Sequence, residues 1–189
     1  MRRVLRNMAV LLMAACCQTA CHAENGSGKP APAEKANKSL VVYFSATGTT
    51  REAARKLAKV ADADLLEITP QKPYTTADLD WHDKQSRSTL EMQDEKARPA
   101  LKMGKRSMAT YKVIYLGYPI WWNQAPRVVN TFVEAYHLNG KTVIPFATSG
   151  GSSIENSVKV LKSTYPKVNW QKGFLLNDAS EANIKKQIK

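Results

Sequence analysis

Short apolar runs alternate with amphipathic segments through most of the chain. The runs are bounded by polar or glycine residues, as is typical of buried β-strands, and lie at 40–44, 64–68, 111–117, 142–146 and 174–176. Between them apolar side chains recur every three or four positions, which predicts helices at 50–60, 126–136 and 154–161 and a short basic one at the C-terminus. This alternation predicts an α/β fold, a doubly wound three-layer sandwich with a parallel sheet.

Two stretches fit this pattern poorly. Pro145 falls in the fourth apolar run, although proline cannot donate to a sheet ladder; we expect it near the end of that strand, with a local irregularity. Residues 69–110 lack a strong period. An excursion of this length is usually functional or loosely ordered.

The N-terminal residues predict export. Arg2, Arg3 and Arg6 precede an apolar stretch at 8–15, and small residues lead to Ala23, as in a secretory signal that is too short to span a membrane. Gly, Pro, Ala and Lys then dominate up to residue 38, which predicts a flexible linker. We therefore expect a signal peptide at 1–23, a linker at 24–38, one domain at 39–189 and a periplasmic location in a bacterium.

All three cysteines lie in or beside this signal, which leaves two fates open. Cleavage after Ala23 would leave a mature protein without cysteine. Alternatively, residues 13–16 resemble a lipobox, and Cys16 would then carry a lipid anchor, the only membrane attachment we expect. In both cases the domain has no thiol chemistry and no disulfide.

The charge favours anionic partners. The whole chain has a formal net charge of +12, and 25 basic against 16 acidic residues leave +9 in residues 24–189. Nucleic acid is not expected as a partner, because we expect the chain to be exported and it has no recognition motif. His82 and His137, the histidines after the signal, are far apart and have no ligand cluster around them, so we expect no metal site.

Three loops follow the first, third and fourth predicted strands and should meet at one sheet edge, where open α/β sheets bind ligands. The first, 45–50, combines four hydroxyl side chains with Gly48 and leads into a helix, which favours an anion site. It lacks the lysine of a Walker A loop, so a nucleoside triphosphate is a poor candidate. The same residues would also fit an ordinary strand-to-helix turn with a serine/threonine N-cap, which any α/β protein could have.

The second loop, 118–126, contains Trp121 and Trp122. If one indole turns inward, the other stays exposed unless a flat ligand covers it. Alternatively, the first tryptophan packs into the core and the second makes a protein contact. We expect Tyr118 to be a core residue. The third loop, 148–152, carries backbone amides without bulky side chains and could hydrogen-bond the polar edge of a ring; alone it would be an ordinary glycine-rich turn.

Together these motifs resemble the flavodoxin-like domains of a bacterial family. The resemblance runs from about Ser39 to the C-terminus and rests on the Ser45 loop, on Tyr118-Pro-Ile-Trp-Trp, on Phe146-Ala-Thr-Ser-Gly-Gly-Ser, and in the excursion on Pro73-Tyr74, Arg87-Ser88, Glu91 and Arg98-Pro99. It implies a five-stranded parallel sheet of order 2-1-3-4-5 and bound FMN. The FMN contacts that it implies are Ser45, Ala46, Thr47, Gly48, Thr49, Thr50, Pro119, Ile120, Trp121, Trp122, Asn123, Thr148, Ser149, Gly150 and Gly151.

The chain also departs from that family. Asn123 stands where glycine is expected, which leaves the path of the second loop open, and electron-shuttling flavodoxins are typically acidic, whereas this chain is basic. The excursion could form surface ion pairs, or Trp81 or Arg87 could line a substrate or partner pocket.

Three functions remain open at this point. The first is an FMN-dependent oxidoreductase acting on a quinone-like acceptor, with chemistry at the flavin N5 and no catalytic side chain identified. The second is a flavodoxin-type electron carrier that docks on a redox protein partner. The third is a non-redox binding module that kept the fold.

Overall fold

The computed structural model describes residues 38–189, apart from residues 103 and 105. The predicted signal peptide at 1–23, its alternative processing at Cys16, and the linker up to residue 37 lie outside the described residues. None of the described helices is long and apolar enough to cross a membrane.

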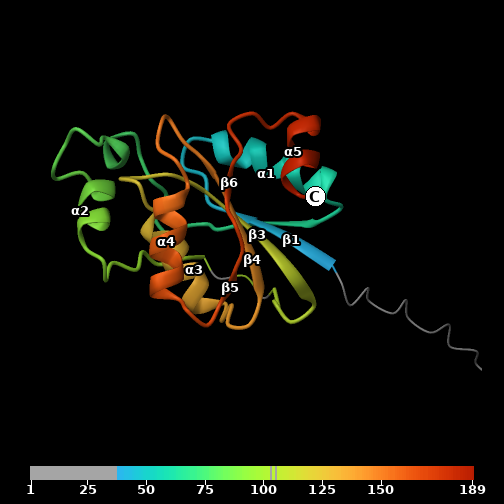
Figure 1. Cartoon of the computed structure of the whole chain (residues 1–189). Helices are drawn as coiled ribbons and strands as arrows, with labels where there is room; N and C mark the ends of the chain where they lie inside the picture. Colours follow the sequence, from blue (N-terminus) through green and yellow to red (C-terminus); the bar gives the residue numbers. More distant parts are fainter. Residues whose placement is uncertain (1–37, 103, 105) are drawn as a thin grey trace, which may run out of the picture. The chain divides into compact units, whose positions relative to one another are not determined.

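The described chain is built on one parallel sheet (Figure 1). Its strands are β1 (Lys38–Tyr43), β2 (Asp64–Glu67), β3 (Tyr111–Pro119), β4 (Thr142–Thr148), β5 (Asn169–Trp170) and β6 (Phe174–Leu175). The order is β2-β1-β3-β4-β5, with β6 also paired to β4. The predicted order 2-1-3-4-5 is confirmed, and the fifth position is shared by two strands of two residues each.

Pro145 lies in the middle of β4, so the prediction that it sits near the strand end was wrong. On one side it is opposite Leu116 of β3. On the other side the partner of β4 changes from β5, at residues 142–143, to β6, at residues 146–147. Since no strand pairs with Pro145 at this break, its missing N–H leaves no ladder bond unmade.

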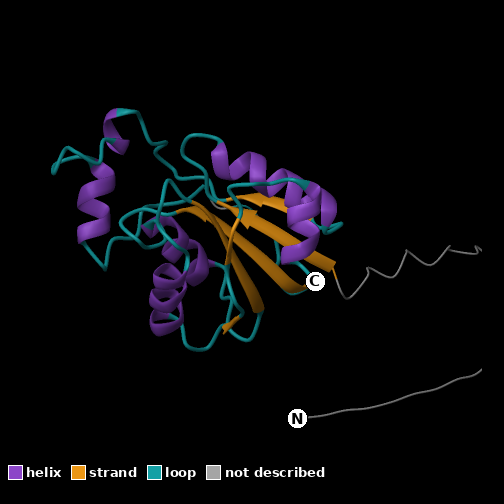
Figure 2. Ribbon diagram, turned by 45° about the horizontal axis from the view of Figure 1, so that its top comes forward, coloured by secondary structure: helices purple, strands orange, loops and turns teal. Residues whose placement is uncertain are grey.

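Helices cover both faces of the sheet, as Figure 2 shows, and form the predicted three layers. On one face lie α1 (Thr49–Val60) and α5 (Glu181–Gln187), and on the other α3 (Arg127–Ala135) and α4 (Glu155–Thr164). Alternate strand residues supply the two cores because successive side chains point to opposite faces. Leu40 and Val42 pack on the α3–α4 side, whereas Val41 and Tyr43 pack under α1 and α5.

The excursion contains two short helices that the sequence pattern did not predict, the 3₁₀ helix η1 (Ala77–Leu79) and α2 (Arg87–Gln93). They stand out from the sheet in Figure 1. The guanidinium of Arg127, from α3, is buried and donates to the backbone carbonyls of Glu91, Met92 and Asp94. This contact fastens the end of α2 to the sandwich.

Candidate functional site

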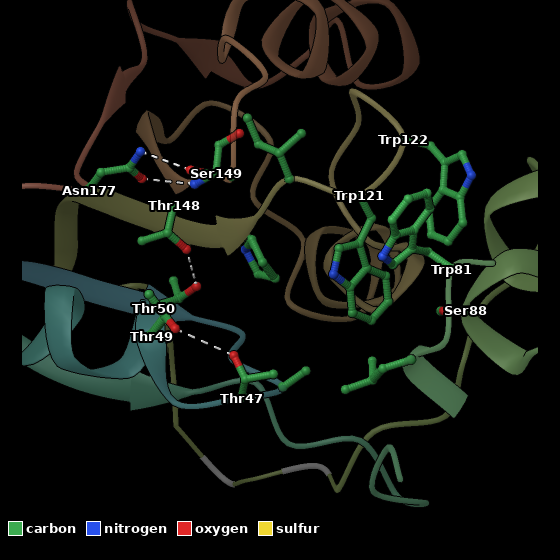
Figure 3. A pocket seen from close by; sticks show the side chains of 15 residues that line it. Thr47, Thr49, Thr50, Trp81, Ser88, Trp121, Trp122, Thr148, Ser149 and Asn177 are labelled. Atoms are coloured by element: carbon green, nitrogen blue, oxygen red, sulfur yellow. Dashed lines mark hydrogen bonds between the residues drawn. The ribbon is translucent and has the colours of Figure 1, made fainter. Parts of the chain in front are cut away.

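A cavity of about 830 Å³ lies at the carboxyl ends of β1, β3 and β4 (Figure 3). This volume is within the usual range for small-molecule sites. Its walls come from the three predicted loops, from the excursion and from the turn after β6. The lining residues are Ala46, Thr47, Thr49, Thr50, Leu79, Trp81, Ser88, Pro119, Ile120, Trp121, Trp122, Thr148, Ser149, Gly150 and Asn177.

The first loop leaves the N-terminus of α1 open toward this cavity. Gly48 precedes the helix with φ of 100°, a left-handed conformation that favours glycine, and its N–H donates to Ser45 Oγ at 3.1 Å. No side chain caps α1, and its first backbone bond runs from Glu52 N to Gly48 O. The amides of the first turn therefore remain available to an acceptor from outside the chain.

Two hydrogen bonds tie the three loops together. The hydroxyls of Thr50 and Thr148 share a bond of 2.7 Å that joins the first turn of α1 to the end of β4. Ile120 N donates to Thr148 O at 2.9 Å, which joins β4 to the tryptophan loop. The walls of the cavity are thus set relative to one another by groups within the protein.

Asn177 holds the third loop, a role that the sequence analysis missed. Its Oδ1 accepts from Ser149 N and its Nδ2 donates to Ser149 O, both at 2.9 Å. Gly151 N donates to Ser149 Oγ at 3.2 Å. Asn177 directly follows the last apolar run, and its position after a strand of the same sheet was the signal that could have identified it.

The two adjacent tryptophans have different surroundings, as predicted. Trp121 is half-buried and packs edge-to-face on Phe44 and Tyr74, with ring centroids 5.6 and 5.3 Å away. Trp122 is 43% exposed. Both line the cavity, so an apolar surface faces its interior.

Trp122 and Asn123 form a two-residue turn between Trp121 and Gln124, which exchange two backbone bonds. Both turn residues are left-handed, with φ of 46° and 59°. Asparagine adopts this region readily, which explains how Asn123 stands in place of glycine. A bulky residue such as Trp122 does so only under strain, and such strain is most common at functional sites.

The excursion supplies a further wall made of Leu79, Trp81 and Ser88. Trp81, one of the two candidates in this segment, therefore lines the cavity. Arg87, the other, is not among the lining residues: it pairs with Glu91 at 2.6 Å and lies 4.0 Å over the ring of Tyr74. Because that ring packs on Trp121, Arg87 supports the wall from behind.

Among the described residues, no charged side chain lines the cavity. Arg51, in the first turn of α1, is engaged with Glu67 at 2.7 Å. Burial, together with the hydrogen bond to Glu91, raises the pKa of Tyr74 and keeps its hydroxyl protonated. Over the described part of the chain, no cluster of three His, Cys, Asp or Glu side chains offers a metal site.

Most of the residues singled out in the sequence reach the cavity. Of that set, Ser45, Gly48, Asn123 and Gly151 do not line it; Ser45 and Gly48 shape the first loop, and Asn123 the turn. Tyr118 is fully buried, as predicted, and its hydroxyl bonds to that of Ser157 at 3.0 Å. Leu79, Ser88 and Asn177 line the cavity but were not predicted to do so.

Comparisons with known proteins agree on one family. The family model described as Flavodoxin matches residues 38–189. A proposed flavoprotein from Bacteroides eggerthii is 58% identical with a TM-score of 0.78, over 80% of this chain and 95% of that one. A flavoprotein from Lactobacillus acidophilus, crystallised in complex with FMN, shares the fold at 21% identity and a TM-score of 0.66, over 80% and 99% of the two chains. No curated protein matches the chain.

Proposed function

The chain belongs to the flavodoxin family, and from this premise we propose that it is an FMN-dependent oxidoreductase that passes electrons to a quinone-like acceptor. The observation that carries the proposal is the uncapped N-terminus of α1, which faces a cavity lined by indole rings. A phosphate and a flat aromatic ring are the two parts of FMN that such a cavity suits. The FMN complex of the Lactobacillus acidophilus relative supports the assignment.

The phosphate of FMN would be held by the first loop. The hydroxyls of Thr47 and Thr49 line the cavity beside the free amides of α1. Since no cation lines this part of the site, hydrogen bonds and the helix dipole supply the attraction.

The ring of FMN would be held by the second and third loops. Trp121 and Trp122 offer apolar surface for stacking. The N–H of Ser149 is committed to Asn177, which leaves the neighbouring Gly150 amide for the polar edge of the ring. An amide there stabilises negative charge on that edge.

When bound, FMN supplies a ring that takes up electrons from a reductant and passes them to an acceptor. A quinone leaves such a site as a hydroquinone, having gained two electrons and two protons. No titratable side chain lines the cavity in the described part of the chain, so no side chain of the lining supplies these protons. Between pH 6 and 9 the protein itself should then impose little pH dependence on the reaction.

The test starts from purified protein loaded with FMN and reduced without oxygen by one equivalent of dithionite. We expect 2-methyl-1,4-naphthoquinone to reoxidise it rapidly, with one hydroquinone formed per FMN. Slow reaction with quinones, together with fast reaction with a one-electron acceptor protein, would favour the electron carrier instead. A protein that binds no FMN would contradict both redox functions.

We also propose that the protein acts outside the cytoplasm, on the basis of residues 1–23. Mass spectrometry of the membrane and soluble fractions separates the two forms of processing. An acylated N-terminal Cys16 indicates a lipoprotein, and a free N-terminal Glu24 indicates a soluble periplasmic protein. An uncleaved Met1 terminus in the cytoplasm would contradict export.

A further inference from the structure

The wall of the cavity that comes from the excursion differs from the walls at the sheet edge. The sheet-edge loops present threonine hydroxyls, free amides and the Trp121–Trp122 pair, which suit FMN. The excursion adds Leu79, Trp81 and Ser88, which belong to none of these loops. In Figure 3, Trp81 and Ser88 lie on the side of the cavity away from Thr49 and Thr50.

Ser88 carries a hydroxyl without a partner. The residue is 1% exposed, and its Oγ makes no hydrogen bond with the described part of the chain. The polar side chains beside it are engaged: Oγ of Ser86, the N-cap of α2, bonds to Thr89, and Arg87 pairs with Glu91. A buried hydroxyl of this kind is unusual in native proteins, and Ser88 lines the cavity.

Trp81 presents a largely exposed indole on the same wall. It is 66% exposed, the most exposed large apolar side chain among the described residues. One ring contact within the chain is with His82, whose ring centroid lies 3.5 Å away at an interplanar angle of 34°. The rest of the indole is exposed beside the cavity, where it offers a surface on which a flat ligand can stack.

We propose that Leu79, Trp81 and Ser88 form an acceptor subsite, distinct from the FMN cradle, that binds an uncharged flat ring bearing a carbonyl oxygen. The ring stacks on Trp81, and the carbonyl accepts a hydrogen bond from Ser88 Oγ. This subsite rests on the proposed function, since it supplies the place of the quinone-like acceptor.

The residues that line the cavity also indicate which acceptors the subsite disfavours. No lysine or arginine lines the cavity among the described residues, so the pyrophosphate of a nicotinamide dinucleotide would have no cationic partner there. A quinone carries no charge, and its oxygens are acceptors that match the free O–H of Ser88. The chemistry of the wall therefore favours quinones over dinucleotides.

The experiment measures binding without turnover. Oxidised, FMN-loaded protein is titrated with 2-methyl-1,4-naphthoquinone by calorimetry in the absence of any reductant. We expect Ser88→Ala and Trp81→Ala each to weaken binding about tenfold and Trp81→Phe to retain most of it. Leu90→Ala is the matched control, because Leu90 is 46% exposed in the same excursion but is not among the lining residues; it should bind like the unchanged protein.

A second probe separates the two contacts. 2-Methylnaphthalene has the ring but no carbonyl, so Trp81→Ala should weaken its binding whereas Ser88→Ala should not. Equal binding of the naphthoquinone to all variants would overturn the subsite. So would a loss of FMN affinity in Ser88→Ala, since Ser88 would then belong to the cofactor site.

The FMN affinity of each variant is measured first, so that the two proposals fail differently. If the unchanged protein binds no FMN, the proposed function is wrong and the acceptor subsite falls with it. If FMN binds and the variants do not discriminate the naphthoquinone, only the acceptor subsite is wrong.

Discussion

Thr50 and Thr148, 98 positions apart in the chain, share a buried hydrogen bond of 2.7 Å between their hydroxyl groups. The bond joins the start of α1, where the phosphate of FMN is proposed to bind, to the end of β4, where the third loop begins. It therefore fixes the distance between two walls of the cavity from inside the protein. Loss of either hydroxyl should affect both stability and FMN binding.

We expect Thr50→Val to lower the free energy of unfolding by about 1–3 kcal/mol, because the partner hydroxyl is left buried and unpaired. Thr148→Val should lower the free energy of unfolding by a similar amount. The double variant should cost less than the sum of the two, since neither hydroxyl then lacks a partner. Urea unfolding of the four proteins measures this coupling, and strictly additive losses would contradict it.

Gly48→Ala should destabilise the protein by about 1–2 kcal/mol. A Cβ at Gly48 meets no atom within 4 Å, so the cost arises from its φ of 100° alone. Gly150→Ala is the matched control, because its Cβ also finds open space and its backbone is not left-handed. We expect the control to stay within about 0.5 kcal/mol in thermal unfolding. A control that loses as much as Gly48→Ala would show that the φ angle is not the cause.

Trp122→Gly should separate stability from binding. Glycine relieves the left-handed strain at φ of 46°, which should stabilise the fold by about 1–2 kcal/mol. Glycine also has more conformational freedom in the unfolded chain, which destabilises the fold. The free energy of unfolding without FMN should therefore change by less than about 1 kcal/mol.

The same variant should bind FMN about tenfold more weakly, because a stacking surface is removed. Trp122→Phe keeps a ring at this position and should retain most of the affinity. Isothermal titration with FMN measures both. Unchanged affinity in Trp122→Gly would remove this indole from the cofactor site.

A pH effect on stability is expected at the opposite edge of the sheet. Lys38, 2.6 Å away, and the Tyr111 hydroxyl, which donates at 2.6 Å, hold the pKa of Asp64 below its ordinary value. A lowered carboxyl pKa stabilises the fold above the ordinary value of about 4 and loses this contribution as the pH falls further. Asp64→Asn should thus cost less than about 1 kcal/mol at pH 7.

The cost of Asp64→Asn should shrink as the pH falls from 5 toward 3, as followed by urea unfolding at each pH. FMN affinity at pH 7 should not change, because Asp64 begins β2 and the cavity lies at the other ends of the strands. A cost that is constant with pH would show that the carboxylate charge is not involved.

The fold was predictable because buried parallel strands are continuous apolar runs and the helices between them carry clear apolar faces. The hydrophobic pattern did not predict the elements that depend on contacts between residues far apart in the sequence. The helix α2 has seven residues and is fastened by Arg127, which comes from another helix. The position of Pro145 within β4 is possible because β4 pairs first with β5 and then with β6, two short strands that share the fifth place in the sheet.

The candidate site was predictable to the extent that its residues follow strands. Loops after β1, β3 and β4 meet at one edge because parallel strands end there. Asn177 follows the same rule after β6, but a lone asparagine carries no motif. Ser88 and Leu79 reach the cavity by tertiary packing of the excursion, which no local period reveals.

The central claim is that the open N-terminus of α1 holds the phosphate of FMN. Titration of the flavin-free protein with FMN and with riboflavin, followed by quenching of flavin fluorescence, tests it most directly. The account predicts that FMN binds at least about a hundredfold more tightly, because riboflavin leaves the amides of the first turn unpaired. Equal affinity for the two flavins, or no binding of either, would contradict it.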